Sequence, residues 1–321
     1  MARKSGTLNN ETLYGTAGND TIWTNKGDDV AYGYAGKDRL VGYLGNDSLF
    51  GGDGSDEIYG DDGNDSMVGG IGNDSIWDGI GDDTLEGGDG NDRLDAHIGN
   101  DRLIGGMGDD LLMAGEDVAW ELGEWSPDKD FVDGGGGDDT LSGGAEEDLL
   151  IGGWGDDRIG GTSGNDTLYG NPGVDSLYGG KNEDLIFAGA DGDRLWGNEG
   201  DDSMSGDGGN DSLFGAMGKD ILVGGDGHDT LDGGSGSDIY VLEDNIGKDI
   251  LQGFKNGEDL LGLSEGLSFN DLTFVKVRGS ATEIRTDGGD RKLLATILGV
   301  KPESIDRSDF ITGQFNPNSW S

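Results

Sequence analysis

The chain of 321 residues contains no cysteine, 4 prolines and 2 histidines, and its 21 basic side chains face 66 acidic ones. Without cysteine, disulfide bonds and thiolate metal sites are excluded. A formal charge of −45 argues against a nucleic-acid partner, because phosphate would be repelled along most of the chain. No apolar run is long enough for a membrane helix, and the first 14 residues contain no apolar signal region. We therefore expect neither a membrane span nor a cleavable secretory signal.

The sequence also lacks the residues that common hydrolases use. His97 and His228 stand far apart and no HExxH motif occurs, which excludes a zinc protease of that type. The string GLSEG at 262–266 resembles a hydrolase elbow, but no histidine follows Ser264. We expect no catalytic residues and a protein that is not an enzyme. A calcium-dependent polysaccharide lyase or epimerase accessory protein is a remote alternative that rests on fold analogy alone.

Glycine and aspartate are in excess, and both are concentrated in the first three quarters of the chain. Residues 1–241 hold 53 acidic and 12 basic side chains and 58 of the 68 glycines. With 32% apolar residues and this charge, a chain of irregular sequence would be disordered. The regular spacing of the aspartates argues against that interpretation.

Aspartate recurs at a fixed step of nine residues in two blocks. The unit reads G-G-x-G-[N/D/S]-D-x-U-x, with U apolar, as in GGDGSDEIY at 51–59 and GGDGHDTLD at 224–232. The position-six aspartates of the first block are Asp20, Asp29, Asp38, Asp47, Asp56, Asp65, Asp74, Asp83, Asp92, Asp101 and Asp110. Those of the second block are Asp139, Asp148, Asp157, Asp166, Asp175, Asp184, Asp193, Asp202, Asp211, Asp220, Asp229 and Asp238. Departures from the pattern at position four are Glu146, Asn182 and Asp191.

This unit predicts an all-β solenoid. Three residues around the apolar position eight can form a short strand with the middle side chain inward, and the glycine-rich remainder can form a tight turn. Two units then make one coil of 18 residues, and stacked coils pair their strands in parallel. The sequence therefore predicts a parallel β-roll with continuous apolar columns.

The aspartate columns predict a bound cation. One buried leucine stabilises by about 1.5–3 kcal/mol, less than the cost of ordering nine residues. Carboxylates stacked on successive turns also repel one another. A hard divalent cation reverses that repulsion, and calcium suits carboxylate and carbonyl oxygens better than magnesium does. If each ion lies between equivalent turns of adjacent coils, the two blocks provide about 19 sites.

The repeat resembles that of the RTX (repeats-in-toxin, haemolysin-type) calcium-binding family over about residues 15–241. The resemblance implies a right-handed parallel β-roll in which the position-six aspartates and turn carbonyls hold calcium. It also implies export by type I secretion machinery, a secreted or cell-surface location, and folding when the chain meets extracellular calcium. No basis exists in these residues for a nucleic-acid or membrane partner.

We predict five segments. They are a cap or degenerate repeat at 1–14, in which Glu11 replaces an aspartate, the first roll block at 15–115, an insertion with Trp120, Trp125 and Phe131 at 116–133, the second block at 134–241, and a β-rich cap at 242–321. Within the last segment we expect strands at 272–277, 281–286 and 292–298, a turn at 287–289, and helical turns near 269–272 and 302–310. By resemblance, this segment also contains the secretion signal.

Aromatic residues recur at position nine, which should face outward. They are Trp23, Tyr32, Phe50, Tyr59, Trp77, Tyr169, Tyr178, Phe187, Trp196 and Phe214. They are explained either by cross-strand stacking or by binding of a glycan or another surface. The sequence thus predicts a secreted, calcium-folded, non-catalytic structural or cell-surface protein. The alternative is an adhesin-like module that binds glycan through these rows or through the insertion.

Overall fold

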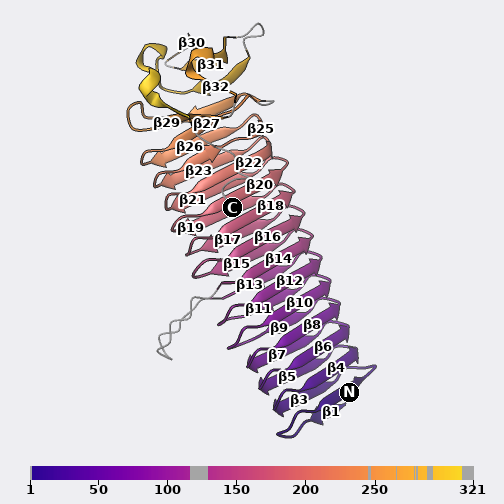
Figure 1. Ribbon diagram of the computed structural model, residues 1–321. Coiled ribbons are helices and arrows are strands. Elements are labelled where there is room, and N and C mark those ends of the chain that lie inside the picture. The colour runs from indigo at the N-terminus through magenta and orange to yellow at the C-terminus, as the bar shows by residue number, and fades with distance from the viewer. Residues whose placement is uncertain are drawn as a thin grey trace. The chain divides into compact units, whose positions relative to one another are not determined.

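The computed structural model describes residues 2–115, 129–244, 247–264, 266–277, 279, 281–287 and 292–312. The chain forms two compact units, Met1–Asp166 and Thr167–Ser321. Each unit is a parallel β-solenoid in which successive strands alternate between two sheets (Figure 1). The predicted all-β parallel roll is confirmed.

Unit 1 contains two parallel sheets. The first consists of β1 (Arg3–Ser5), β3 (Thr21–Lys26), β5 (Arg39–Leu44), β7 (Glu57–Asp62), β9 (Ser75–Trp77), β11 (Arg93–Asp95), β13 (Leu111–Met113), β15 (Thr140–Gly144) and β17 (Arg158–Thr162). The second consists of β2 (Thr12–Thr16), β4 (Val30–Ala35), β6 (Ser48–Asp53), β8 (Ser66–Ile71), β10 (Thr84–Asp89), β12 (Arg102–Met107), β14 (Phe131–Gly136) and β16 (Leu149–Trp154).

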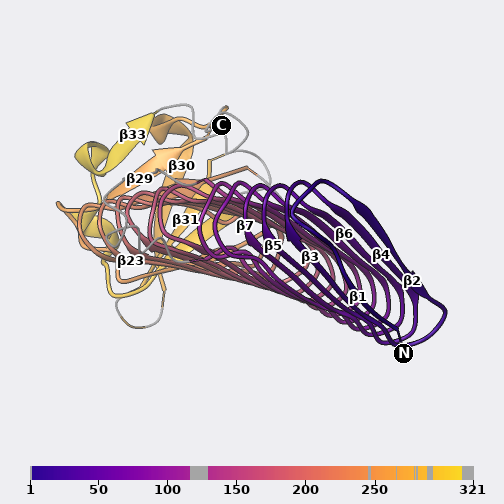
Figure 2. The same cartoon turned by 90° about the horizontal axis from the view of Figure 1, so that it is seen from below.

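Strands of one sheet pair at an offset of 18 residues, as the two-unit coil requires. Ile22 pairs with Leu40, and Leu40 with Ile58. These position-eight side chains are fully buried and stack into apolar columns between the sheets. Figure 2 shows the successive coils of unit 1 one behind another, each returning to the same path. The apolar column therefore forms because every coil has the same length.

Glycine at position four is required by the turn. Gly54 has a φ of 139°, and a Cβ there would collide with the carbonyl oxygen of Gly36 in the preceding coil. The three residues that replace this glycine also adopt positive φ values: 66° for Glu146, 77° for Asn182 and 79° for Asp191. The turn geometry is thus kept at some local strain.

Unit 2 continues the same architecture in its own two sheets. One contains β18 (Thr167–Pro172), β20 (Leu185–Ala190), β22 (Ser203–Gly209), β24 (Ile221–Val223), β27 (Ile239–Leu242), β29 (Leu260–Leu263) and β33 (Phe310–Thr312), and β25 (Asp226–Gly227) also pairs with β22. The other contains β19 (Ser176–Lys181), β21 (Arg194–Glu199), β23 (Ser212–Met217), β26 (Thr230–Ser235) and β28 (Asp249–Gln252).

The parallel roll extends further than the nine-residue repeat. We expected the C-terminal cap to begin at residue 242, but β28 pairs in parallel with β26, and β29 pairs in parallel with β27. The loops before these strands are longer than a repeat turn, so the spacing is lost while the coil is kept. The first elements after the last repeat therefore belong to the roll.

The predicted strands and helical turns of the C-terminal cap are confirmed. They are β30 (Leu272–Lys276), β31 (Thr282–Thr286), β32 (Leu293–Ile297), and the 3-10 turns η2 (Phe269–Asp271), η3 (Pro302–Ser304) and η4 (Arg307–Asp309). The three strands pair antiparallel, and β32 also pairs with β28 of the roll. The expected turn at 287–289 lies largely outside the described residues.

Tyr240 joins the core of the roll to this cap. It occupies position eight of the last repeat and is fully buried. Its hydroxyl donates to the carbonyl of Gln252 at 2.9 Å and accepts from the N–H of Gly233 at 2.8 Å. The ring meets Phe254 edge-on at 5.6 Å. The apolar column thus ends on a side chain whose polar end is fully bonded.

Helices contribute little to the described parts of the chain. The helical elements described there are 3-10 turns of three residues each, and none of the described helices has the length and apolar character needed to span a bilayer.

Candidate metal sites

All of the predicted position-six aspartates are buried, and each unit gathers its own into two columns. In unit 1, one column runs through Asp20, Asp38, Asp56, Asp74, Asp92, Asp110, Asp139 and Asp157. In unit 2, one column runs through Asp175, Asp193, Asp211 and Asp229. Residues 18 apart in a regular coil are therefore brought together, as the pairing of alternate units predicts.

One oxygen of each carboxylate holds adjacent coils in register. Oδ1 of Asp56 accepts the backbone N–H of Asp38 at 2.7 Å, and Oδ1 of Asp74 accepts that of Asp56 at 2.7 Å. The same bond recurs through unit 1, and in unit 2 it reaches from Asp175 as far as the last repeat. A carboxylate is needed here because the N–H is buried and needs an acceptor.

The second oxygen has a different environment. Oδ2 is buried and makes no hydrogen bond in Asp29, Asp38, Asp56, Asp65, Asp74, Asp83, Asp92, Asp110, Asp139, Asp193, Asp202, Asp211, Asp220, Asp229 and Asp238. Leaving so many buried carboxylate oxygens without a donor or a cation is unfavourable. A repeated ligand position is therefore built into both units.

A small space beside each such oxygen explains the glycine at position one. A Cβ built on Gly33 would lie 2.6 Å from the carbonyl oxygen of Gly51 and still closer to Oδ2 of Asp38. We call this space, which a Cβ at position one would fill, the position-one cradle. The same pair of oxygens surrounds the cradles at Gly51, Gly69, Gly87, Gly105, Gly134, Gly170, Gly206 and Gly215.

The oxygens of the cradle fit calcium. Calcium takes carboxylate and carbonyl oxygens at about 2.3–2.6 Å, and the cradle brings one of each to a common point. Gly33 has no positive φ, so the position needs glycine for its lack of a Cβ and not for its backbone conformation. The aspartate and the glycine of each repeat thus serve the same small volume.

Burial sets the electrostatics of the columns. Loss of solvent, partly offset by the backbone hydrogen bond, raises the pKa of Asp74, Asp110 and Asp220 to about 7. The same causes raise the pKa of Asp139 and Asp193 to about 8. Neighbouring carboxylates of the same column raise these pKa values further. The columns therefore favour a bound positive charge, either a proton or a metal ion.

Three column residues escape the nine-residue pattern. Asp130 receives the N–H of Asp101 at 2.7 Å, and it stands nine residues before Asp139, so the spacing already resumes inside the segment assigned to the insertion. Asp249 and Asp259 accept from Asp229 and Asp238, each at 3.2 Å. Their separations of 20 and 21 residues hide them from a search for a fixed step.

Phe131 also lies in the roll. It is the first residue of β14, and the guanidinium of Arg102 lies 4.2 Å from the centre of its ring. Trp120 and Trp125 of the predicted insertion lie outside the described residues.

Two position-six aspartates near the N-terminus have a bonded Oδ2. The hydroxyl of Thr24, at position one, donates to Asp47 at 3.2 Å and to the carbonyl of Gly42 at 2.6 Å. The backbone N–H of Thr16 donates to Oδ2 of Asp20 at 2.6 Å. Glu11, which we placed in an N-terminal cap, donates its N–H to Asp29 and turns its carboxylate towards Thr7. The first coil is thus closed by side chains and not by a further column aspartate.

The aromatic rows at position nine are half-buried and stack along the sheets. Tyr178 and Trp196 are parallel at 4.5 Å between ring centres, and Tyr59 and Trp77 at 4.9 Å. Further stacked pairs are Tyr32 with Phe50, Tyr169 with Phe187, and Trp196 with Phe214. Cross-strand stacking therefore accounts for most of these residues.

The family model for the RTX calcium-binding nonapeptide repeat (4 copies) matches the chain repeatedly. The matched stretches are 5–40, 32–67, 41–76, 59–94, 77–112, 126–159, 133–168, 151–186, 160–195, 178–213, 187–222 and 214–245. The chain belongs to this family. It is a calcium-binding β-roll protein, and the cradles are the places in it whose oxygens fit the ion.

Solved structures with a similar course of chain include three calcium-related or extracellular proteins. The AlgE6R3 subunit of the Azotobacter vinelandii mannuronan C5-epimerase is 24% identical, with 38% of this chain and 78% of that chain covered and a TM-score of 0.31. A hyperactive, Ca²⁺-dependent, β-helical antifreeze protein from an Antarctic bacterium is 19% identical, with 80% and 84% covered and a TM-score of 0.32. The extracellular lipase LipA from Serratia marcescens is 19% identical, with 81% and 45% covered and a TM-score of 0.31. No curated protein sequence matches the chain.

Proposed function

We propose that this RTX protein is a secreted, non-catalytic scaffold whose roll folds when the chain meets extracellular calcium. The position-six aspartates, together with Asp130, Asp249 and Asp259, supply Oδ2 as a ligand, and the position-one carbonyls supply a second oxygen. Family membership supports export by type I secretion machinery and a place outside the cell or on its surface. The role is structural, because the repeated chemistry of the chain is spent on holding coils together.

One observation carries this proposal: the cradle recurs with the same two oxygens along both units. A catalytic site is formed once, by residues of different types that converge on a reacting atom. Here one arrangement is repeated at almost every coil, and each copy joins a coil to the next. Bound calcium therefore acts on folding, because its binding free energy is gained only when two coils are stacked.

Counting bound calcium tests the proposal. We expect equilibrium dialysis against radioactive calcium to give on the order of 19 ions per chain, with half-saturation at about millimolar free calcium. Replacing Asp74 by Ala removes Oδ2 from the Gly69 cradle and the acceptor of the Asp56 N–H. This variant should bind at least one ion fewer and lose about 1–3 kcal/mol of stability in calcium.

Asp89→Ala is the matched control. Asp89 is exposed and lies in the same repeat region, but outside both columns. It should leave the number of ions and the unfolding midpoint unchanged. A count of only one or two ions, or equal losses in the two variants, would contradict the assignment of the column aspartates.

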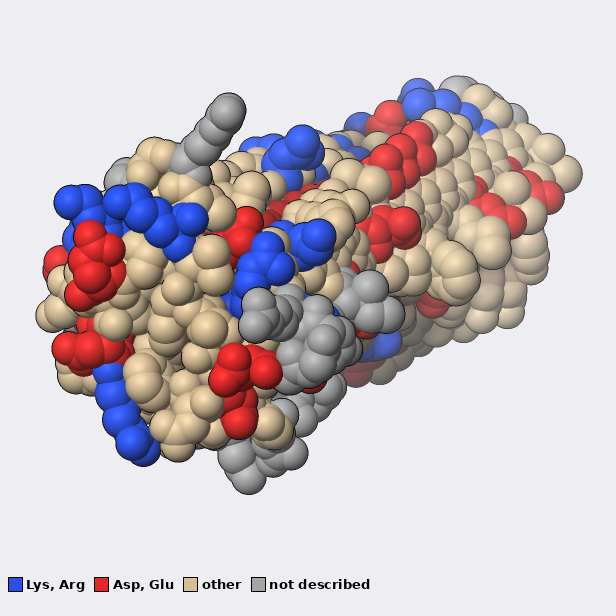
Figure 3. All heavy atoms as spheres, turned by 90° about the horizontal axis from the view of Figure 1, so that it is seen from above, with Lys and Arg blue, Asp and Glu red and all other residues tan. Residues whose placement is uncertain are grey.

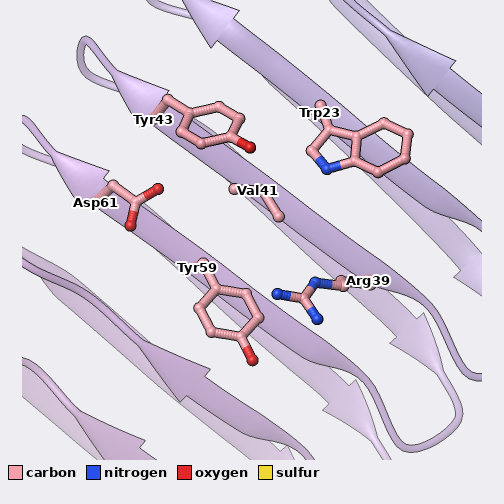
Figure 4. Close-up of a pocket in the computed structure, with 6 residues that line it drawn as sticks. All are labelled: Trp23, Arg39, Val41, Tyr43, Tyr59 and Asp61. Atoms are coloured by element: carbon pink, nitrogen blue, oxygen red, sulfur yellow. The ribbon is translucent and has the colours of Figure 1, made fainter.

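A second candidate function, sugar binding, is favoured by a depression on unit 1. A hollow of about 350 Å³ lies on the outer face of β3, β5 and β7. Figure 4 shows its lining side chains arranged around Val41, with the aromatic rings and the charged groups turned to the same side. They are Trp23, Arg39, Tyr43, Tyr59 and Asp61.

The lining combines the two features that sugar recognition needs. Trp23 and Tyr59 flank Val41 in register on neighbouring strands, which gives an apolar platform for a sugar ring. The Arg39 guanidinium lies 4.6 Å from the centre of the Tyr59 ring and 3.7 Å from Glu57, so it is held at the edge of the platform. Tyr43 has a φ of 80°, a strained conformation that turns an exposed ring to this face.

Trp23→Ala and Tyr43→Ala should abolish binding on a glycan array in calcium if the depression is a sugar site. The control is Trp154→Ala, because Trp154 is 73% exposed and lies away from the depression. Array signals that persist in both variants, or that disappear equally with Trp154→Ala, would remove the depression from consideration.

A further inference from the structure

Asp78 breaks the rule for position one in a way that changes the metal chemistry. It stands where neighbouring repeats have Gly60, Gly69 and Gly87, and only 7% of it is exposed. Ligand oxygens of Asp65, Asp78 and Asp83 all lie within 4.8 Å of one another, and each of these residues is buried. Oδ2 of Asp78 makes no hydrogen bond. The molecule therefore buries three carboxylates together with an unpartnered oxygen among them.

The Asp78 carboxylate enters the cradle of the preceding coil. A Cβ built on Gly60 would lie 2.5 Å from Oδ2 of Asp65 and still closer to Oδ1 of Asp78. In the matching cradle at Gly69, the oxygens are Oδ2 of Asp74 and the carbonyl of Gly87 at 2.7 Å. Asp78 thus places a charged oxygen where the other cradles have a neutral carbonyl.

The same side chain fills the cradle of its own coil. At position one the cradle is the space taken by a Cβ, and Asp78 has a Cβ where Gly69 and Gly87 have none. The ordinary place beside Oδ2 of Asp83 is therefore occupied by protein. Asp83 is left to share its oxygen with the group formed by Asp65 and Asp78.

We infer that Asp65, Asp78 and Asp83 form one three-carboxylate site that binds calcium more tightly than the ordinary cradles, and that binds trivalent lanthanide ions more tightly still. The inference rests on the proposed function, in which the cradles hold calcium. Affinity of an oxygen site for calcium rises with the charge of its ligands, and a third carboxylate also matches the charge of a trivalent ion. The ion held here is the last to leave unit 1 as free calcium falls.

Calcium titration calorimetry on the full chain tests the site. Wild-type protein should show a tight step of about one ion, roughly tenfold or more tighter than the remaining steps. Asp78→Gly restores the residue of the other repeats, and should lose the tight step while it still folds in millimolar calcium. Asp78→Asn keeps the shape of the side chain without its charge, and should weaken the same step.

The reciprocal change is Gly87→Asp, which introduces a carboxylate at the Gly69 cradle, beside Asp74. It should create a second tight step. Terbium(III) added below one equivalent, and excited through tryptophan, should report the same site, because Trp77 precedes Asp78 in the chain. The luminescence of this first equivalent should fall in Asp78→Gly.

Failure of this inference and failure of the proposed function give different results. A chain that binds calcium at many sites and folds, but whose tight step is unchanged or stronger in Asp78→Gly, overturns the three-carboxylate site alone. A chain that binds no calcium overturns both. If Asp78→Asn binds as tightly as wild type, Asp78 contributes shape and not charge, and the inference is again wrong.

Discussion

Withdrawal of calcium with a chelator is expected to convert both units from compact parallel sheet to an expanded coil. At pH 8 the columns then contain stacked buried carboxylates with neither a proton nor a metal ion, and their mutual repulsion opposes stacking of the coils. We expect loss of the β-sheet signal in circular dichroism and a large increase in hydrodynamic radius. Readdition of calcium to about millimolar should restore both in one cooperative step.

Magnesium supplies the control for this experiment. It has the same charge, but it demands a tight octahedron and keeps its waters, so it should restore the sheet poorly. Full refolding in magnesium would show that charge neutralisation alone is enough and that the cradle geometry is unimportant. A chelated chain that kept its sheet signal and its radius would contradict the central role of calcium.

The acidic surface alone does not cause this dependence on calcium. Lys, Arg, Asp and Glu side chains all reach the surface on the face seen in Figure 3, where water and salt screen them. The column aspartates are buried instead. Salt therefore cannot replace calcium inside the columns, and the expected unfolding is a property of those buried groups.

The periodic part of the fold could be predicted because each coil repeats the same spacing. Leu40 and Asp38 lie where their positions in the nine-residue unit require, one in the apolar column and one in the aspartate column. Alternation of apolar residues likewise predicted β31 and β32 of the cap. Local pattern was sufficient wherever the local pattern and the coil agree.

The prediction failed where the coil is kept while the spacing changes. Asp249 occupies a column although two extra residues separate it from the position that the repeat predicts, because the loop before β28 absorbs them. Asp130 was missed for another reason: it is on the step, but its repeat lacks the usual glycines before it. Stacking of strands, which no sequence period records, decides membership of a column.

The role of position one could not be read from the sequence at all. Glycine is so frequent in the repeat that Gly33 gives no separate signal, and its function depends on atoms of two coils. Asp78 was likewise one acidic residue among many until the structure placed it against Asp65. Contacts between residues 18 apart, and not composition, identify these two positions.

Acidification of the calcium-free protein is expected to restore part of the fold. Burial raises the pKa of Asp74, Asp110 and Asp220 to about 7, whereas an aspartate in the unfolded chain has a pKa of about 3.9. Between these values the folded state binds more protons than the unfolded state. Stability of the calcium-free fold therefore falls as pH rises through this window, and it is gained as pH falls.

In a chelator, the chain should be expanded at pH 8 and should become more compact, with more sheet, near pH 5. In calcium the sign is opposite for binding: protons compete for the same oxygens, so the calcium midpoint should rise between pH 8 and pH 6. Molar salt at pH 8 is the control, because it screens exposed charge without protonating the columns. If salt compacts the calcium-free chain as much as acid does, general repulsion is responsible. If neither radius nor calcium midpoint changes with pH, the buried columns do not titrate as their burial requires.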